Sequence, residues 1–303
     1  MKYNSLLFGN GLTLNLLYQL KPYIPENKRY LLSIDLFLKE WIKGGISPRE
    51  ENKLYTAFYG NRKDMQQKFK LIKDNLNVFF QNYSSDLEYF LGATLFEKTE
   101  DDLLKSVKMV FPLFYNAWWI ILAEYLEYQN LNNRINNFYQ QVAEIITKPG
   151  YIYTTNFDLF ADSLHSEHLH GCFLPNIKGY NDIIFHSYND EEFYYKYVWG
   201  HNGIGKLNLI EKLRVYPDCP SYFNFNFFFD SDLKMDNMLI YGMGFKKSGY
   251  INQLQELQES GKLNQVDVTY YDESEKEYLR NVLDACMVPN YRLISCQNFD
   301  FHI

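Results

Sequence analysis

The sequence predicts an α/β fold, namely a Rossmann-like parallel sheet with a large inserted helical subdomain. Strand-like and helix-like segments alternate at the start of the 303-residue chain and again in its last quarter, which is typical of parallel α/β packing. Residues 30–148 instead carry apolar positions at helical spacing and few strand-like runs, over a length too great for one crossover connection. We therefore expect residues 1–29 and 149–303 to form the Rossmann domain and residues 30–148 to form the insertion.

The first strand is expected at Tyr3–Phe8, followed by the turn Gly9-Asn10-Gly11 and an apolar helix over Leu12–Leu20. A phosphate-binding βα turn requires this order, because glycines permit close approach of the backbone and a helix N-terminus supplies N–H donors. The match to G-x-G-x-x-G is partial, since Leu14 replaces the third glycine. Glycine turns also follow first strands for steric reasons alone, and this alternative stays open.

The second strand is expected at Tyr151–Thr155, directly after the break at Pro149-Gly150. Asn156 and Asp158 follow its carboxyl end, and open α/β sheets bind ligands at that edge. Because Asn and Asp are also common helix caps, an equally open interpretation is that one of them only caps a helix beginning at Phe157.

The rest of the sheet is expected in the last quarter of the chain. Residues 173–236 are expected to be mostly irregular, with a helix at Asn208–Leu213. The later elements are strands at Asn237–Tyr241, Val266–Tyr271 and Tyr291–Ile294, and helices at Ile251–Gln258 and Ser274–Ala285. The turn Gly242-Met243-Gly244 follows the first of these strands. In a parallel sheet this turn, the first glycine turn and Asn156 meet at one edge, and their convergence is stronger evidence than any one motif.

Composition argues against several classes of function. Lys plus Arg total 30 against 37 Asp plus Glu, a formal charge of −7, which gives no support for binding a nucleic-acid backbone. We recognise no signal peptide, and the most apolar stretch, residues 110–125, contains Pro112, Asn116 and Glu124 and is too interrupted to span a membrane. The four cysteines form no C-x-x-C pair. We expect a cytoplasmic protein that contacts neither nucleic acid nor membrane.

Two other kinds of site have weaker support. The run from His165 to Cys172 contains five potential metal ligands, but their spacing matches no established pattern, so we predict no metal. Gly200–Lys206 approaches the phosphate-loop pattern, yet Leu207 stands where a Ser or Thr hydroxyl should bind Mg²⁺. We expect that segment to be a glycine-rich turn.

The ordered motifs resemble those of the Sir2 (sirtuin) family, in particular the Sir2-like NAD-consuming domains of bacterial antiphage defence. The resemblance lies in Gly9-Asn10-Gly11, Thr154-Thr155-Asn156-Phe157-Asp158, His170-Gly171 and Gly242-Met243-Gly244-Phe245. The chain is also similar to the AbiH-type abortive-infection proteins, which share a G-N-G start and a later H-G. The matching positions are few, although they span about 240 residues of the chain.

The resemblance implies NAD as the substrate and assigns roles to single residues. It makes His170 the catalytic base and implies that Asn156 orients the water or ribose. The residues implied to bind the cofactor are Gly9, Asn10 and Gly11 at the pyrophosphate turn, Asn156 and Asp158 at the nicotinamide ribose and carboxamide, and Gly242, Met243 and Gly244 at the adenosine half. Histidine, with an ordinary pKa of about 6.5, suits a base near neutral pH.

This sequence departs from the family pattern at several positions. Asn10 replaces the usual alanine, and Thr13 stands where serine is frequent. Met243-Gly244 replaces a small-hydroxyl pair, which puts one ribose or phosphate contact in doubt. The paired C-x-x-C zinc module of the sirtuin deacetylases is missing from the sequence, and this favours NAD hydrolysis over deacetylation.

The expected function is therefore hydrolysis of NAD to nicotinamide and ADP-ribose by a regulated antiphage (abortive infection) effector that is inactive until triggered. Uncontrolled NAD loss is toxic, so we expect the off state to be held by a homo-oligomer or a protein partner through the insertion, with a phage-derived trigger as another possible partner. The alternative left open is a non-catalytic NAD- or nucleotide-binding sensor or scaffold subunit of a defence complex.

Overall fold

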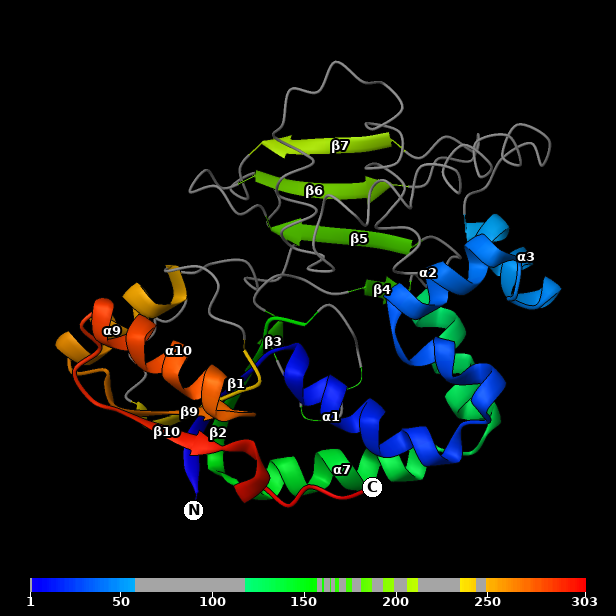
Figure 1. Cartoon of the computed structure of the whole chain (residues 1–303). Helices are drawn as coiled ribbons and strands as arrows, with labels where there is room; N and C mark the ends of the chain where they lie inside the picture. The colour runs from blue at the N-terminus through cyan, green and yellow to red at the C-terminus, as the bar shows by residue number, and fades with distance from the viewer. Residues whose placement is uncertain are drawn as a thin grey trace. The chain divides into compact units, whose positions relative to one another are not determined.

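The computed structural model describes residues 2–57, 118–156, 235–243 and 249–303, together with residues 160 and 164 and short strands between residues 167 and 211. It contains a six-stranded parallel sheet flanked by helices (Figure 1). The predicted Rossmann-like α/β fold is thereby confirmed for the described part of the chain.

The chain divides into two compact units. The first unit carries the parallel sheet and consists of Met1–Pro22, Leu131–Gly171 and Cys219–Ile303. The second consists of Tyr23–Asn130 and Cys172–Asp218. The boundaries differ from those drawn on the sequence, since residues 131–148 belong with the parallel sheet and residues 172–218 belong with the second unit.

The parallel sheet has the strand order β10-β9-β8-β1-β2-β3, and every neighbouring pair is parallel. Its strands are β1 (Tyr3–Phe8), β2 (Ile146–Thr154), β3 (Glu167–His168), β8 (Met235–Tyr241), β9 (Leu263–Tyr270) and β10 (Tyr291–Ser295). The chain proceeds from β1 to β2 and β3 on one side, and β8, β9 and β10 extend the sheet on the other. The topological switch point of the sheet therefore lies between β1 and β8.

The central strands are buried on both faces. In β1 every residue except Asn4 is buried, and the last four residues of β8 are buried as well. Continuous apolar runs of this kind are typical of parallel sheets, because helices cover both faces. The same property makes such runs recognisable in the sequence.

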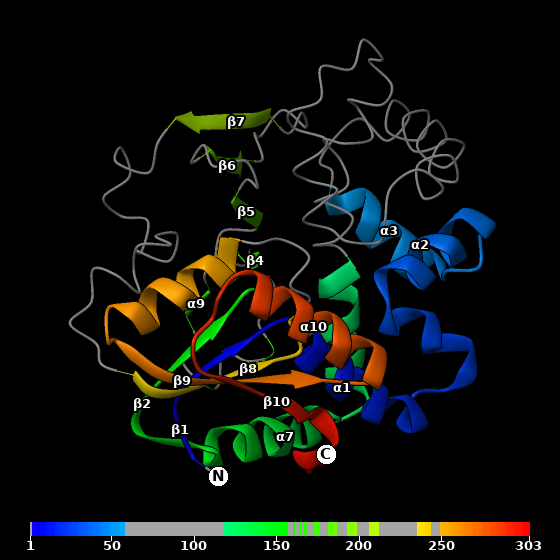
Figure 2. The same ribbon diagram turned by 60° about the vertical axis from the view of Figure 1, so that its left-hand side comes forward.

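Helices α9 (Gly249–Glu259) and α10 (Glu273–Ala285) cover one face of the sheet. Their buried side chains form one core cluster with residues of β8 and β9, including Ile251, Leu254, Leu279, Leu283, Ile240 and Val268. Figures 1 and 2 show these two helices on the side of the sheet opposite to α7 (Asn132–Glu144). The two α-helices after β8 therefore share one face.

The other face is covered by α1 (Asn10–Leu20), α7 and the C-terminal residues. The ring of Phe301 packs on Tyr241 of β8 at 5.8 Å and on Phe138 of α7 at 5.7 Å, measured between ring centroids. Gln19 of α1 donates from Nε2 to the carbonyl oxygen of Phe301 at 2.6 Å. The chain's last described residues thus join the two helices over the sheet.

The second unit contains the helices α2 (Ile34–Lys43) and α3 (Pro48–Ala57), helical residues 118–128 and a second sheet. This sheet is antiparallel, and its strands are β4 (Phe173–Pro175), β5 (Asn181–His186), β6 (Phe193–Val198) and β7 (Lys206–Glu211). The predicted helix at Asn208–Leu213 is wrong over residues 208–211. A short apolar run fits the hydrophobic period of a helix or of a strand. Here the segment pairs with β6, so its backbone hydrogen bonds are satisfied in a strand.

A second difference concerns the start of β2. The strand begins at Ile146, before the Pro149-Gly150 pair that was expected to precede it. Tyr3 pairs with Ile146 and Ser5 with Tyr151, so the register shifts where the Pro-Gly pair lies. Pro and Gly are tolerated within strands at such irregular positions.

Candidate functional site

The predicted ligand edge is formed by the carboxyl ends of three adjacent strands. Phe8, the last residue of β1, pairs with Tyr241 of β8 on one side and with Thr154 of β2 on the other. The turns after these strands consequently start at the same level, at the switch point of the sheet. Of the residues predicted to form the site, the structure brings together Gly9, Gly11, Asn156 and Gly242.

The first and the late glycine turns are hydrogen-bonded to each other. The N–H of Gly9 donates to the carbonyl oxygen of Tyr241 at 3.0 Å, and the N–H of Gly11 donates to that of Gly242 at 2.9 Å. Neither amide is available as a phosphate donor in this conformation. Their partners come from residues more than 200 positions away, so this contact could not be predicted from the sequence.

Close packing of the two turns explains the glycines. A Cβ on Gly11 would lie 2.5 Å from the Cα of Gly242, and a Cβ on Gly242 would lie 2.6 Å from the Cα of Gly11. Gly242 also has a φ of +61°, a left-handed conformation that disfavours other residues. Gly11 and Gly242 are therefore needed for steric reasons, which was the alternative left open from the sequence. In the predicted site, the contacts to a pyrophosphate would then come from neighbouring groups.

Asn10 is the neighbour best placed for that role. It is exposed and is the first residue of α1, whose N-terminus carries partial positive charge. Within the described part of the chain, its N–H has no hydrogen-bond acceptor. An anion at the turn would therefore meet Asn10 before it met the glycine amides.

Asn156 is buried, with 7% of its surface exposed, and its side chain is fixed to the first turn of α1. Its Nδ2 donates to Oγ1 of Thr13 at 3.0 Å, and its backbone N–H donates to Oγ1 of Thr154 at 3.0 Å. The residue before it joins the end of β2 to the end of β1, because the N–H of Thr155 donates to the carbonyl oxygen of Phe8 at 3.0 Å. The side chain of Asn156 is thus held against the start of α1 at the edge.

Two polar residues at this edge were not identified from the sequence. Thr269, near the end of β9, accepts a hydrogen bond from the N–H of Gly242 at 3.0 Å. Tyr241, the last residue of β8, accepts one from Nδ2 of Asn15 at 2.9 Å, and burial raises its pKa to about 12. In the sequence, these two residues could be noticed only as polar side chains at the carboxyl ends of strands. That feature is too common to identify either residue as part of a site.

Asp158, His170 and Gly244 lie outside the described residues, so the roles assigned to them stay predictions. Met243 is described, and its side chain is buried in the core cluster beneath the late turn. A ligand at the edge would therefore meet the backbone of Met243 rather than its thioether. Among the described residues no cluster of metal-ligating side chains occurs; His165, His170 and Cys172 are not part of that set.

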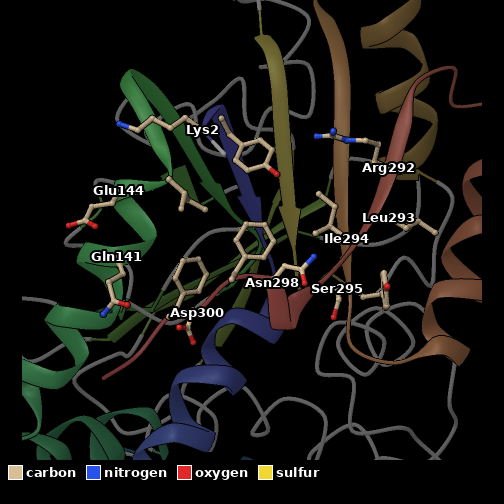
Figure 3. Close-up of a pocket in the computed structure, with 14 residues that line it drawn as sticks. Lys2, Gln141, Glu144, Arg292, Leu293, Ile294, Ser295, Asn298 and Asp300 are labelled. Carbon is tan, nitrogen blue, oxygen red and sulfur yellow. The ribbon is translucent and has the colours of Figure 1, made fainter.

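A pocket of about 740 Å³ lies elsewhere on the first unit, and none of the predicted site residues lines it. Figure 3 shows Gln141 and Glu144 of α7 on one side and Arg292 of β10 on the other. Arg292 is bound to the buried carboxylate of Asp267, from Nη2 to Oδ2 at 2.6 Å, and Tyr3 donates its hydroxyl to the same oxygen at 2.8 Å. These contacts satisfy Asp267 internally, so we assign this cluster a structural role.

No family model, curated protein or solved structure matches this chain. In the residues that the structure describes, no helix is both long enough and apolar enough to cross a bilayer. Functional inference therefore depends on the geometry of the carboxyl edge and on the motifs that it brings together.

Proposed function

We propose that the carboxyl edge of the parallel sheet binds NAD and that the protein hydrolyses it to nicotinamide and ADP-ribose. The observation that supports this most directly is the position of Asn156. Its buried amide is fixed by Thr13 at the switch point, beside the two joined glycine turns. Dinucleotides bind to Rossmann-like sheets at this place.

The proposed hydrolysis of NAD requires a different contribution from each site residue. Breaking the bond between nicotinamide and ribose builds positive, oxocarbenium-like character on the ribose, so the site needs an oriented water and a base. In this proposal Asn156 orients the water or the ribose hydroxyl, and His170 accepts the proton. Asp158 accepts a hydrogen bond from the carboxamide. A positioned base contributes roughly 10²- to 10⁴-fold to the rate.

The buried Asn156 amide supports this assignment on physical grounds. An amide held by a hydrogen bond in a buried position keeps its orientation before the substrate arrives, and such preorganisation lowers the cost of reaching the reactive geometry. In this proposal Asn10, which is exposed at the start of α1, contacts the pyrophosphate. The tight packing of Gly9 and Gly11 then serves to place this helix N-terminus.

The decisive experiment follows nicotinamide and ADP-ribose released from NAD by purified protein, His170→Ala and Asn156→Ala. His302→Ala and Asn133→Ala are matched controls, because both side chains are exposed and neither belongs to the proposed site. We expect release by the wild type and both controls, and a loss of about 10²-fold or more in the two site variants. Full activity in a folded His170→Ala protein would remove His170 from the mechanism.

The biological role proposed is that of an antiphage effector that is inactive until triggered, with the off state held by self-association or by a partner protein. Its test is the NAD level of infected cells that express the wild type or His170→Ala. NAD should fall on infection with the wild type only. If the purified protein binds NAD by calorimetry, and infected cells keep their NAD, the non-catalytic sensor or scaffold role is favoured instead.

A further inference from the structure

The peptide groups of Gly242 are held from two sides. Its N–H donates to Oγ1 of Thr269 at 3.0 Å, and its carbonyl oxygen accepts from the N–H of Gly11 at 2.9 Å. Together the two hydrogen bonds hold the left-handed conformation of Gly242. The turn after β8 is thus attached both to β9 and to the turn after β1.

Thr269 is itself firmly placed. It is only 3% exposed, and β9 lies between β8 and β10, so the strand is paired on both sides. A buried hydroxyl is unfavourable unless it is hydrogen-bonded, and valine has nearly the same shape and suits a buried strand at least as well. The hydroxyl of Thr269 is therefore explained by its hydrogen bond, in which it accepts from the N–H of Gly242.

From this geometry we propose that Thr269 is a positioning residue, which holds the late glycine turn against the first turn and thereby sets the affinity for the dinucleotide. Thr269, Gly242 and Gly11 connect the ends of β9, β8 and β1 into one preorganised surface. Binding to a surface that is already ordered avoids the entropic cost of ordering it. The effect on the ligand rests on the proposed function, whereas the effect on the turn does not.

The test compares Thr269→Val, which removes the acceptor, with Thr269→Ser, which keeps it. Thr147→Val is the matched control, because Thr147 also uses its hydroxyl in a hydrogen bond, to the carbonyl oxygen of Tyr3 at the opposite end of β1. The first readout is hydrogen exchange of the Gly242 amide by NMR. We expect exchange about tenfold faster in Thr269→Val, and no change in Thr269→Ser or in the control.

The second readout is NAD affinity by calorimetry, with kcat and KM for nicotinamide release. We expect binding about tenfold weaker and KM raised in Thr269→Val, with kcat unchanged, and recovery in Thr269→Ser. Thermal melting verifies folding, and Thr269→Ala replaces the valine variant if that variant does not fold.

The outcomes separate the two proposals. Unchanged Gly242 exchange in a folded Thr269→Val protein overturns the positioning role, whatever NAD does. Faster exchange with unchanged NAD affinity overturns the link to the ligand. If the wild type binds no NAD, the proposed function and the link to NAD fail together, while the exchange result still decides whether Thr269 fixes the turn.

Discussion

Asn156 illustrates how a single contact determines the chemistry of a site. Its side chain contacts the hydroxyl of Thr13 at 3.0 Å, and this hydrogen bond holds the amide against the first turn of α1. The sequence placed Asn156 at the edge correctly, because the strand before it was recognisable. Its partner was not predictable, since Thr13 is 143 residues away in the chain.

The contact between Thr13 and Asn156 can be tested by removing the Thr13 hydroxyl. Thr13→Val removes the hydroxyl that Nδ2 of Asn156 contacts at 3.0 Å, and losing a hydrogen bond to a buried amide costs about 1–3 kcal/mol and loosens the side chain of Asn156. We expect kcat for nicotinamide release to fall about tenfold or more, and Thr13→Ser to restore it. A folded Thr13→Val protein with wild-type kcat would show that Thr13 does not orient Asn156.

Among the helices and strands, those buried on both faces were predicted best from the sequence. Strand β1 was expected at Tyr3–Phe8 and has those bounds, because a central parallel strand is apolar on both faces. Strand β7 was missed because Lys206–Glu211 alone fits more than one period and depends on its partner strand. The glycine turns were expected at the edge and lie there, but their mutual hydrogen bonds depend on the fold as a whole.

Asp267 of β9 joins three strands of the sheet. Its carboxylate is only 1% exposed and accepts hydrogen bonds from Arg292 of β10 and from Tyr3 of β1. Burial opposes its ionisation, but the hydrogen bonds from Arg292, Tyr3 and Gln265 outweigh burial and hold the pKa of Asp267 below its ordinary value. An acid within a buried strand was visible in the sequence, but its partners were not.

This depressed pKa predicts how stability depends on pH. The carboxylate contributes stability above the pKa it has when unfolded, about 3.9, and that contribution is lost as the pH falls through the lower folded pKa. Asp267→Asn should therefore lower the free energy of unfolding at pH 7 by roughly 2–3 kcal/mol, less than for a wholly buried pair because Arg292 is half-exposed.

Urea unfolding at pH 7 and near pH 3 provides the measurement for Asp267→Asn. The difference between wild type and variant should shrink at the acid end, because below about pH 3.9 the unfolded wild-type chain takes up a proton at this carboxyl that the folded chain takes up only at lower pH. Asp236→Asn is the matched control, because Asp236 is exposed on the neighbouring strand β8. An equal difference at both pH values would contradict an ionised Asp267 as the stabilising group.

At the scale of the whole molecule, the second unit is built from two insertions into the parallel sheet. One, Tyr23–Asn130, separates β1 from β2, and the other, Cys172–Asp218, separates β3 from β8. The sequence indicated the first insertion by its helical periodicity. It did not indicate the second, because aromatic residues without a clear period suit loops and strands alike.

This division predicts where NAD should stabilise the protein. A ligand bound only by the folded state adds about 2.7 kcal/mol at a concentration 100 times its Kd, and protection appears where contacts are made. The proposed site uses only the first unit, so hydrogen exchange measured by mass spectrometry should slow in peptides that contain the first turn, Asn156 and the late turn. ADP-ribose should protect the two glycine turns, and nicotinamide alone should not. Protection confined to Tyr23–Asn130 would place the ligand in the second unit, and the carboxyl edge would then no longer be the binding site.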